Sequence, residues 1–167
     1  MTNIVLCGMM GSGKTTVAAA LGRLYNLEII DTDEEIVKEY GDITSIFSTC
    51  GEEKFRDIES EVTAKISERS KGAVISLGGG CVLRHANVEK LKDSGKIFYL
   101  RTSPETIIKR LKGDSSRPLL KGDLEERVRT ISSARAKIYE AAADYIVDTD
   151  EKSPEEIAAI IMEHMSE

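Results

Sequence analysis

Short apolar runs alternate with amphipathic stretches along the whole chain. Five runs have the length of a buried strand and are bounded by polar residues or glycine; they cover residues 3–7, 27–30, 73–77, 96–100 and 145–147. After the first run, apolar side chains recur at helical spacing at Val17, Leu21 and Leu24. Apolar strands that alternate with amphipathic helices are typical of a parallel sheet with helices on both faces. The pattern therefore predicts an α/β fold.

Several predicted helices begin with a capping sequence. The Ser-Pro-Glu sequences at 103–105 and 153–155 each combine a capping hydroxyl, a proline at the first helical position and an acid in the first turn. Asp123 followed by Glu126 resembles a capping box. The final helix carries one apolar face, made of Ile157, Ile160, Ile161 and Met165.

Two connections are longer than the sheet requires. Residues 32–70 contain two or three predicted helical segments without a strand between them, and we expect a small cap there. The segment GDSSRPLLKG at 113–122 begins and ends with glycine and carries Arg117 before a proline. A mobile lid that closes over a nucleotide and excludes water needs such glycine ends and a cation. An ordinary surface loop is the alternative interpretation.

The composition is that of a globular protein. The chain has 167 residues, of which 41% are hydrophobic and 31% charged, and it contains no low-complexity stretch or internal repeat. This length suits one compact domain, so residues 1–167 are predicted to form a single domain. No run approaches the roughly 18 apolar residues of a membrane span, and residues 1–10 lack a basic leader, so a cytoplasmic protein without membrane contact is expected.

Charge and cysteine usage narrow the function classes. The formal net charge of −6 disfavours a nucleic-acid-binding protein, because that function requires basic surface that neutralises phosphates. Cys7, Cys50 and Cys81 are widely spaced and match no zinc pattern. Reduced thiols are therefore expected rather than a disulfide framework.

A phosphate-binding loop follows the first predicted strand. Residues 8–15, GMMGSGKT, match G-x-x-x-x-G-K-[ST] with a strand before and a helix after. The glycines let backbone amides surround phosphate oxygens, Lys14 reaches the terminal phosphates, and Thr15 offers a hydroxyl to Mg²⁺. No guanine-reading [NT]KxD motif is present, so ATP is favoured over GTP. The predicted nucleotide-binding residues of the loop are Gly11, Ser12, Gly13, Lys14, Thr15 and Thr16.

Two acids follow the second predicted strand, at Asp31 and Asp33. An acid at the end of a strand near such a loop commonly holds the water shell of the metal, and Asp31 has that place. A simple helix cap is the alternative for Asp31. Asp33 could accept hydrogen bonds from hydroxyl groups of an alcohol and align one oxygen with the terminal phosphate. A solvated acid in a first helical turn is the alternative for Asp33.

The arginines and a glycine triplet complete the candidate site. On a helix, Arg56 lies within reach of Glu52 and Glu59, which favours an ordinary ion pair. The triplet Gly78–Gly80 follows a predicted buried strand, and close approach of a ligand to the backbone would explain why side chains are absent there. Periodicity does not decide whether Arg135 points inward or outward.

Together these motifs resemble the shikimate kinases, a family within the nucleoside-monophosphate-kinase-like P-loop group. The matching sequences run in family order over nearly the entire chain. They are GMMGSGKTT at 8–16, DTD at 31–33, GEEKFRDIE at 51–59, GGG at 78–80, RPLL at 117–120, and Arg135 with Tyr139 ahead of ADYIVDT.

The resemblance implies a fold and a reaction. The implied fold is a three-layer α/β/α P-loop fold with a five-stranded parallel sheet of order 2-3-1-4-5, a substrate-binding cap near 32–60 and a lid near 112–123. The implied reaction transfers the γ-phosphoryl group of ATP to the 3-hydroxyl of shikimate, in the route to aromatic amino acids. The implied partners are ATP and shikimate, with Mg²⁺ as cofactor, and a monomer is expected.

The resemblance also implies roles on the acceptor side of the site. Asp33 would hold the ring hydroxyls, and Arg56 and Arg135 would bind the substrate carboxylate. Gly79, with Gly78 and Gly80, would lie against the ring.

On the nucleotide side, Lys14 and Arg117 would stabilise charge on the transferring phosphoryl group. Thr15 and, through water, Asp31 would hold Mg²⁺. Arg110 would stack on the adenine.

Two positions depart from the family pattern. The family often has an arginine near the adenine after the VDT sequence, where this chain offers only Lys152. The family usually has a threonine before the first glycine of the triplet, and Leu77 cannot supply its hydroxyl.

Two other functions compete with this one. A gluconate or nucleotide kinase would share the phosphate loop, but it would not be expected to combine DTD, FR and GGG. An ATP-dependent switch that acts on a protein partner would hydrolyse ATP slowly and without dependence on shikimate.

Overall fold

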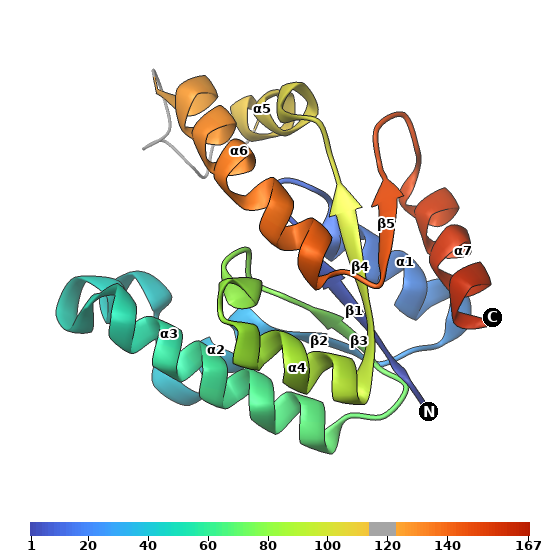
Figure 1. The fold of residues 1–167 in the computed structure, drawn as a ribbon, viewed down its shortest axis with the longest axis horizontal. Helices are drawn as coiled ribbons and strands as arrows, with labels where there is room; N and C mark the ends of the chain where they lie inside the picture. The colour runs from blue at the N-terminus through green and yellow to red at the C-terminus, as the bar shows by residue number, and fades with distance from the viewer. Residues whose placement is uncertain (114–122) are drawn as a thin grey trace.

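A computed structural model of the chain describes residues 1–113 and 123–167. Its centre is a five-stranded, all-parallel sheet of order β2-β3-β1-β4-β5 (Figure 1). The expected order 2-3-1-4-5 is therefore confirmed. The strands are β1 (Asn3–Cys7), β2 (Ile29–Asp31), β3 (Val74–Ser76), β4 (Gly95–Arg101) and β5 (Tyr145–Asp148).

Each predicted apolar run contains a strand, but the bounds differ by a few residues. β1 has the expected bounds of 3–7, whereas β2 begins two residues later than expected and includes Asp31. β4 extends one residue beyond the apolar run at each end, because the backbone pairing with β1 begins at Gly95. Pairing between neighbouring strands, rather than side-chain polarity, sets these ends.

Helices cover both faces of the sheet, as Figure 1 shows. They are α1 (Lys14–Tyr25), α2 (Thr32–Tyr40), α3 (Ile43–Arg69), α4 (His85–Ser94), α5 (Pro104–Lys112), α6 (Leu124–Ala142) and α7 (Pro154–Met165), with a short 3₁₀ helix η1 (Cys81–Leu83). Among the described residues, no helix combines the length and apolar character needed to cross a bilayer.

Alternating side chains of the central strand enter two separate apolar cores. Ile4 and Leu6 pack with residues of α1 and α7, whereas Val5 and Cys7 pack with residues of α3, α4 and α6. Successive strand residues point to opposite faces, so a strand that is apolar throughout is buried on both. The three-layer architecture follows directly from that pattern.

The capping predictions are confirmed at two helices and wrong at a third. Ser103 Oγ accepts from the amide of Thr106, and Ser153 forms a full capping box with Glu156. Asp123 precedes α6, but its side chain accepts no capping hydrogen bond. The backbone of Asp123 (φ −105°, ψ 6°) lies outside the extended region that N-cap residues typically adopt.

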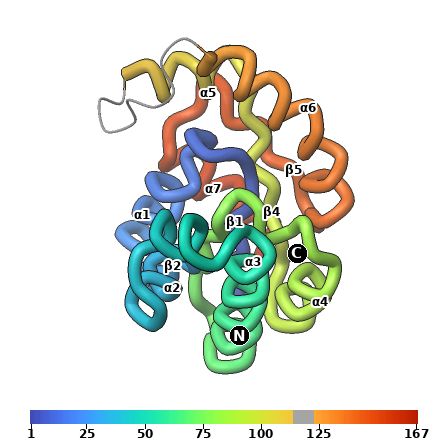
Figure 2. Tube along the Cα trace, turned by 90° about the vertical axis from the view of Figure 1, so that its left-hand side faces the viewer, coloured from blue at the N-terminus to red at the C-terminus, as the bar shows by residue number. Residues whose placement is uncertain are grey.

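Residues 32–70 form helices without an intervening strand, as expected. α2 begins directly after β2, and α3 is interrupted at Gly51, whose φ of 83° is not helical. Gly51 therefore divides the segment into three helical pieces. Figure 2 views the molecule from the side of α3, whose first part lies in front of the strands and below the phosphate loop.

Candidate active site

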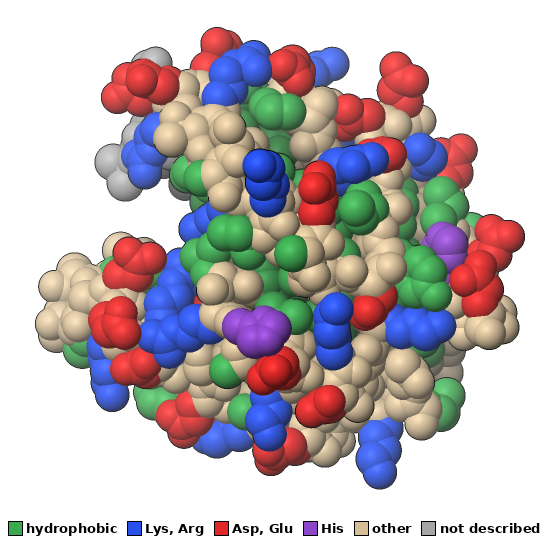
Figure 3. Space-filling view, in the orientation of Figure 1, with side chains coloured by type: hydrophobic (Ala, Val, Ile, Leu, Met, Phe, Trp, Pro, Cys, Tyr) green, Lys and Arg blue, Asp and Glu red, His purple; other side chains and the backbone are tan. Residues whose placement is uncertain are grey.

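A cavity of about 690 Å³ opens at the edge of the sheet where the parallel strands end. It lies between α3 on one side and α6 on the other, and Figure 3 shows the corresponding hollow in the surface. The predicted nucleotide-side residues on its walls are Gly11, Gly13, Lys14, Thr15, Thr16, Asp31 and Arg110. The predicted acceptor-side residues on its walls are Asp33, Arg56, Gly78, Gly79, Gly80 and Arg135. The fold therefore gathers both sets around one space.

The phosphate loop connects β1 to α1 and is held by its own lysine. Lys14 Nζ donates to the carbonyl oxygens of Gly8 at 2.6 Å and Met9 at 3.0 Å. Burial lowers the pKa of Lys14 to about 8, against the raising effect of Cys7, Asp33 and Asp31. The ammonium group is thus held against the backbone of the loop.

Three other residues support the loop from different directions. Ser12 is buried and does not line the cavity; its amide donates to Met9 O at 3.1 Å. Thr16 Oγ1 donates to Gly13 O at 3.0 Å, and Arg110 Nη1 donates to Gly11 O at 2.9 Å. Arg110 comes from α5, so α5 and the loop are fixed to one another across the nucleotide side of the cavity.

Asp31 caps α2 and also lines the cavity. Its Oδ1 accepts from the amides of Asp33 at 2.9 Å and Glu34 at 3.1 Å, which is the helix-cap interpretation of this residue. The cap uses one carboxylate oxygen, and the side chain remains on the cavity wall beside Thr15 and Ser76. A cap and a metal-side role are therefore compatible in one residue.

Asp33 lies in the first turn of α2 and faces the cavity rather than bulk solvent. Burial raises the pKa of this carboxyl and Asp31 raises it further, while Lys14 and Arg56 lower it. A carboxylate with a raised pKa accepts a proton more readily than an exposed aspartate does.

The glycine triplet makes room for side chains of the protein itself. An ideal Cβ on Gly78 would lie 2.7 Å from Asp33 Oδ1, and one on Gly80 would lie 2.6 Å from Arg56 Cζ. At Gly79 the nearest atom is Arg135 Nη1, at an ordinary contact distance of 3.4 Å. Close approach therefore explains Gly78 and Gly80, and the groups that approach them are the protein's own Asp33 and Arg56.

Arg56 takes part in an ion pair and also lines the cavity. Its Nη1 donates to Glu59 Oε1 at 2.8 Å, and its Nη2 lies 3.5 Å from Glu52 Oε1. Glu59 is 2% exposed, and burial raises the pKa of its carboxyl while the hydrogen bond from Arg56 lowers it. The pair holds the guanidinium group in place over Gly80.

Arg135 points inward from α6. Within residues 1–113 and 123–167 it forms no ion pair with a carboxylate, in contrast to Arg56. Tyr139, one turn later on the same helix, donates its hydroxyl to Gly79 O at 2.7 Å. The turn that carries the glycines is thus bound to the helix that carries Arg135.

Sequence reasoning did not identify Glu59 or the apolar wall as parts of the site. Glu59 was considered only as a partner of Arg56, and only the fold shows that the pair is buried beside the cavity. The apolar wall includes Ile43, Phe47, Phe55, Leu77 and Ile131. Four of them lie on α3 or α6 with the spacing of core-facing residues, and Leu77 ends an apolar run, so the sequence holds no signal that separates them from the core.

Three further expectations from the sequence have different outcomes. Arg117 and most of the expected lid segment lie outside the described residues. Lys152 Nζ donates to Asp148 O at 3.0 Å in the loop after β5. Leu77 is buried and contributes an amide to Leu6 O at 3.0 Å, so its side chain belongs to the core.

No group of three or more His, Cys, Asp or Glu side chains is arranged to hold a metal within the described part of the chain. Mg²⁺ in kinases is commonly held by one or two protein groups together with substrate phosphates. The exposed Thr15 hydroxyl and Asp31, which share the cavity, fit that arrangement.

Comparisons with known proteins agree on one family. The sequence model of the family described as "Shikimate kinase" matches residues 10–166. The shikimate kinase of Caldicellulosiruptor saccharolyticus is 44% identical over 169 residues, covering 99% of this chain and 97% of that protein. The shikimate kinase of Thermodesulfovibrio yellowstonii is 44% identical over 164 residues, covering 97% of this chain and 94% of that protein.

Solved structures give the same result. Shikimate kinase from Acinetobacter baumannii in complex with shikimate superposes with a TM-score of 0.90 at 34% identity, covering 99% of this chain and 93% of that chain. Shikimate kinase from Aquifex aeolicus superposes with a TM-score of 0.83 at 37% identity, covering 99% of this chain and 96% of that chain.

Proposed function

Because this chain belongs to the shikimate kinase family, whose members phosphorylate shikimate with ATP in the aromatic amino acid pathway, we propose that its cavity performs that reaction with the residues gathered there. One observation carries the assignment of residues. Asp33, Arg56, Arg135 and the glycine triplet line the same cavity as Lys14 and Thr15. An acceptor bound among the first group would therefore face the terminal phosphate bound by the second.

Arg56 and Arg135 bind the carboxylate of shikimate. Two guanidinium groups can hold a carboxylate through charge-assisted, planar hydrogen bonds that lysine does not reproduce. The two arginines contribute differently, because Arg56 is already oriented by Glu59 and Arg135 has no carboxylate partner among the described residues. Arg135 thus supplies a positive charge that the carboxylate of shikimate neutralises when it binds.

Asp33 orients the acceptor hydroxyl and takes its proton. In the transfer, a bond forms between the 3-oxygen of shikimate and the γ-phosphorus, and the bond from that phosphorus to the β,γ-bridging oxygen of ATP breaks. The hydroxyl proton passes to Asp33, and ADP leaves with the bridging oxygen. The raised pKa of Asp33 suits that role, although a loose transition state demands more of alignment than of base strength.

Lys14 and the amides of the phosphate loop bind the β- and γ-phosphates and stabilise the charge that develops during transfer. Arg117 is assigned the same electrostatic role from its sequence position alone. Arg110, already bonded to Gly11, lies on the nucleotide side of the cavity and is assigned to the adenine.

Thr15 and, through a water molecule, Asp31 would hold Mg²⁺. When bound, this ion neutralises phosphate charge. The chain itself aligns the two substrates, because the phosphate loop, α2 and the Gly78–Gly80 turn all line the cavity.

Further properties follow from the same proposal. Residues 32–60 act as a cap over shikimate and residues 1–167 as one domain, while the lid expected near 112–123 lies mostly outside the described residues. The enzyme is proposed to work as a monomer in the cytoplasm, where its thiols remain reduced; Cys7 and Cys81 are buried in any case.

Coupled detection of ADP release tests the substrate assignment. We expect ADP release that depends on shikimate and Mg²⁺, with product formed in equal amount to ADP. Gluconate and nucleoside monophosphates serve as competing acceptors. Release that is equally fast with those acceptors, or that ignores all of them, would favour a different kinase or an ATP-dependent switch.

A further inference from the structure

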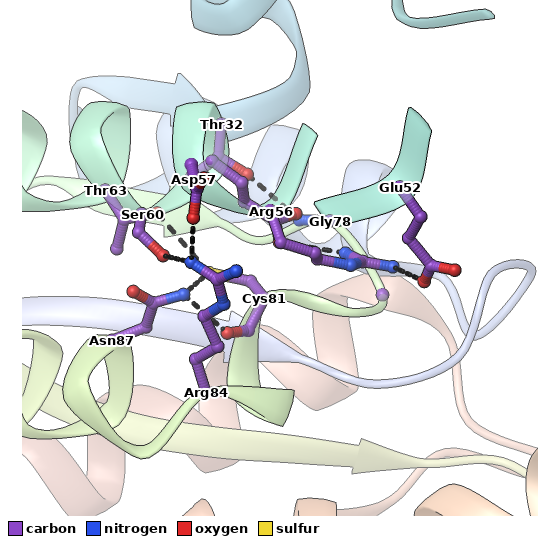
Figure 4. Close-up of polar contacts among 12 residues, drawn as sticks. Thr32, Glu52, Arg56, Asp57, Ser60, Thr63, Gly78, Cys81, Arg84 and Asn87 are labelled. Atoms are coloured by element: carbon purple, nitrogen blue, oxygen red, sulfur yellow. Dashed lines mark hydrogen bonds and ion pairs between the residues drawn. The ribbon is translucent and has the colours of Figure 1, made fainter. Parts of the chain in front are cut away.

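A set of buried polar side chains outside the cavity fixes the turn that carries the glycine triplet (Figure 4). The amide of Gly78 donates to Thr32 Oγ1 at 2.9 Å. At the other end of the turn, Asn87 Nδ2 donates to the carbonyl oxygen of Cys81 at 2.9 Å. Thr32 is 0% exposed and Asn87 is 3% exposed, so neither side chain is available to a ligand.

Thr32 links the turn to the residue that orients the acceptor. It is the first residue of α2 and directly precedes Asp33, whose carboxylate lies against Gly78. The hydrogen bond from Gly78 to Thr32 therefore sets the distance between that carboxylate and the turn. If the hydroxyl were lost, the partly buried amide of Gly78 would lose its acceptor, and the start of α2 would be free to shift.

Asn87 fixes the opposite end of the turn through its hydrogen bond to Cys81, the residue that follows Gly80. The turn itself is short, with backbone bonds from the amide of Cys81 to Gly78 O and from the amide of Leu83 to Gly80 O, both 3.1 Å. Because Arg56 lies directly over Gly80, a shift of this end would move the surface against which the guanidinium group rests.

Arg84 joins the same region to α3, the helix that carries Arg56. Its Nη1 donates to Asp57 Oδ1 at 2.8 Å and contacts Ser60 Oγ at 3.4 Å, as Figure 4 shows. The turn is thus bonded to α2, α3 and α4. Of these helices, α2 carries Asp33 and α3 carries Arg56, two of the acceptor-side groups.

We propose that Thr32 and Asn87 are positioning residues for the acceptor substrate. They hold the Gly78–Cys81 backbone at both ends and thereby set the relative places of Asp33 and Arg56. Neither residue lines the cavity, and the groups that they position, Asp33 and Arg56, belong to its acceptor side, so we expect the larger effect on shikimate. This inference rests on the proposed function, but it concerns residues that no step of the reaction uses directly.

The test exploits an isosteric pair at residue 32. Thr32→Val keeps the shape and removes the acceptor, whereas Thr32→Ser keeps the hydroxyl. We expect Thr32→Val to raise KM for shikimate about tenfold, the factor that corresponds to loss of one hydrogen bond, and to leave KM for ATP within about twofold. Thr32→Ser should restore most of the loss.

Thr63→Val is the matched control. Thr63 is also 0% exposed and lies in the same cluster, but its hydroxyl contacts Cys81 Sγ at 3.4 Å and no backbone group of the turn. It should lower thermal stability without a comparable rise in KM for shikimate. An equal rise in Thr63→Val, or an equal rise in KM for ATP in Thr32→Val, would reduce Thr32 to a general stability residue and overturn the proposal.

Asn87→Leu keeps the proposal testable if Thr32→Val does not fold. This nearly isosteric change removes the donor to Cys81 O, and the same selective rise in KM for shikimate is expected. Unchanged KM in the folded variants would refute the proposal, whereas an absence of shikimate-dependent ADP release in the unmodified protein would instead refute the proposed function.

Discussion

The carboxylate of Asp33 occupies the space that a side chain on residue 78 would need. Its Oδ1 lies 2.7 Å from the ideal Cβ position of Gly78. Since Asp33 and Gly78 come from different elements, this contact fixes the start of α2 against the turn after β3. The glycine is therefore required by the geometry of the acceptor site and not by an unusual backbone conformation.

Gly78→Ala tests that relationship. The added methyl group should displace the Asp33 carboxylate, and kcat/KM for shikimate should fall about tenfold to a hundredfold, matching the 1–3 kcal/mol that an overpacked site commonly costs. Gly79→Ala should cost much less, because the nearest atom to its Cβ is at an ordinary contact distance of 3.4 Å. Steady-state kinetics decide the order, and equal losses in the two variants would contradict the steric explanation.

Asp33→Asn tests proton acceptance and alignment. The amide keeps the size of the side chain but removes the base, so kcat should fall by a factor of about 10² to 10⁴, the usual range for a lost general base. Binding of an ATP analogue, measured by calorimetry, should be preserved. Turnover at the native rate would remove Asp33 from the role assigned to it.

The two arginines should respond differently to substitution. Arg135→Lys should raise KM for shikimate by about tenfold to a hundredfold, as expected for weakened charged hydrogen bonds of 1.5–3 kcal/mol, with little change in melting temperature. Arg56→Met should raise KM and also destabilise the fold by about 3 kcal/mol, because it leaves the buried Glu59 without its partner.

Kinetics and thermal unfolding of both variants separate substrate binding from stability. The contrast would fail if Arg135→Lys were as destabilising as Arg56→Met. It would also fail if neither change affected KM for shikimate.

Activity should depend on the charge of Lys14. Burial lowers its pKa to about 8 in the protein without nucleotide, so kcat/KM for ATP should fall as pH rises through that value. Bound phosphate favours the charged ammonium group, so kcat at saturating ATP should begin to fall at a higher pH than kcat/KM for ATP does. A pH profile of both parameters checks this, and a flat kcat/KM for ATP between pH 7 and 9 would contradict it.

Local signals in the sequence were sufficient to predict an α/β fold with helices on both faces of a parallel sheet, whereas the strand order came from the family resemblance. The run at 3–7 is apolar throughout because both faces of β1 are buried, and the Ser-Pro-Glu sequences mark two helix starts with side chains that act on their own neighbours. The phosphate loop could also be predicted from the sequence, because its function requires particular residue types at fixed spacing.

The features that could not be predicted from the sequence depend on the backbone conformation of the folded chain or on contacts between segments far apart along it. The same Asp-x-x-Glu pattern that suggested a capping box at Asp123 forms none there, because the backbone of that residue is not extended. The meaning of Gly78 and Gly80 depends on Asp33 and Arg56, which approach from α2 and α3. Whether Arg135 faces inward was open until α6 was placed beside the cavity.

The most direct test of the residue assignments is a crystal structure of the protein with shikimate and a non-hydrolysable ATP analogue. We predict that the shikimate carboxylate contacts both Arg56 and Arg135, and that its 3-hydroxyl lies within hydrogen-bonding distance of Asp33 and faces the terminal phosphate. A shikimate molecule bound with its carboxylate away from both arginines, or with no hydroxyl near Asp33, would contradict the account.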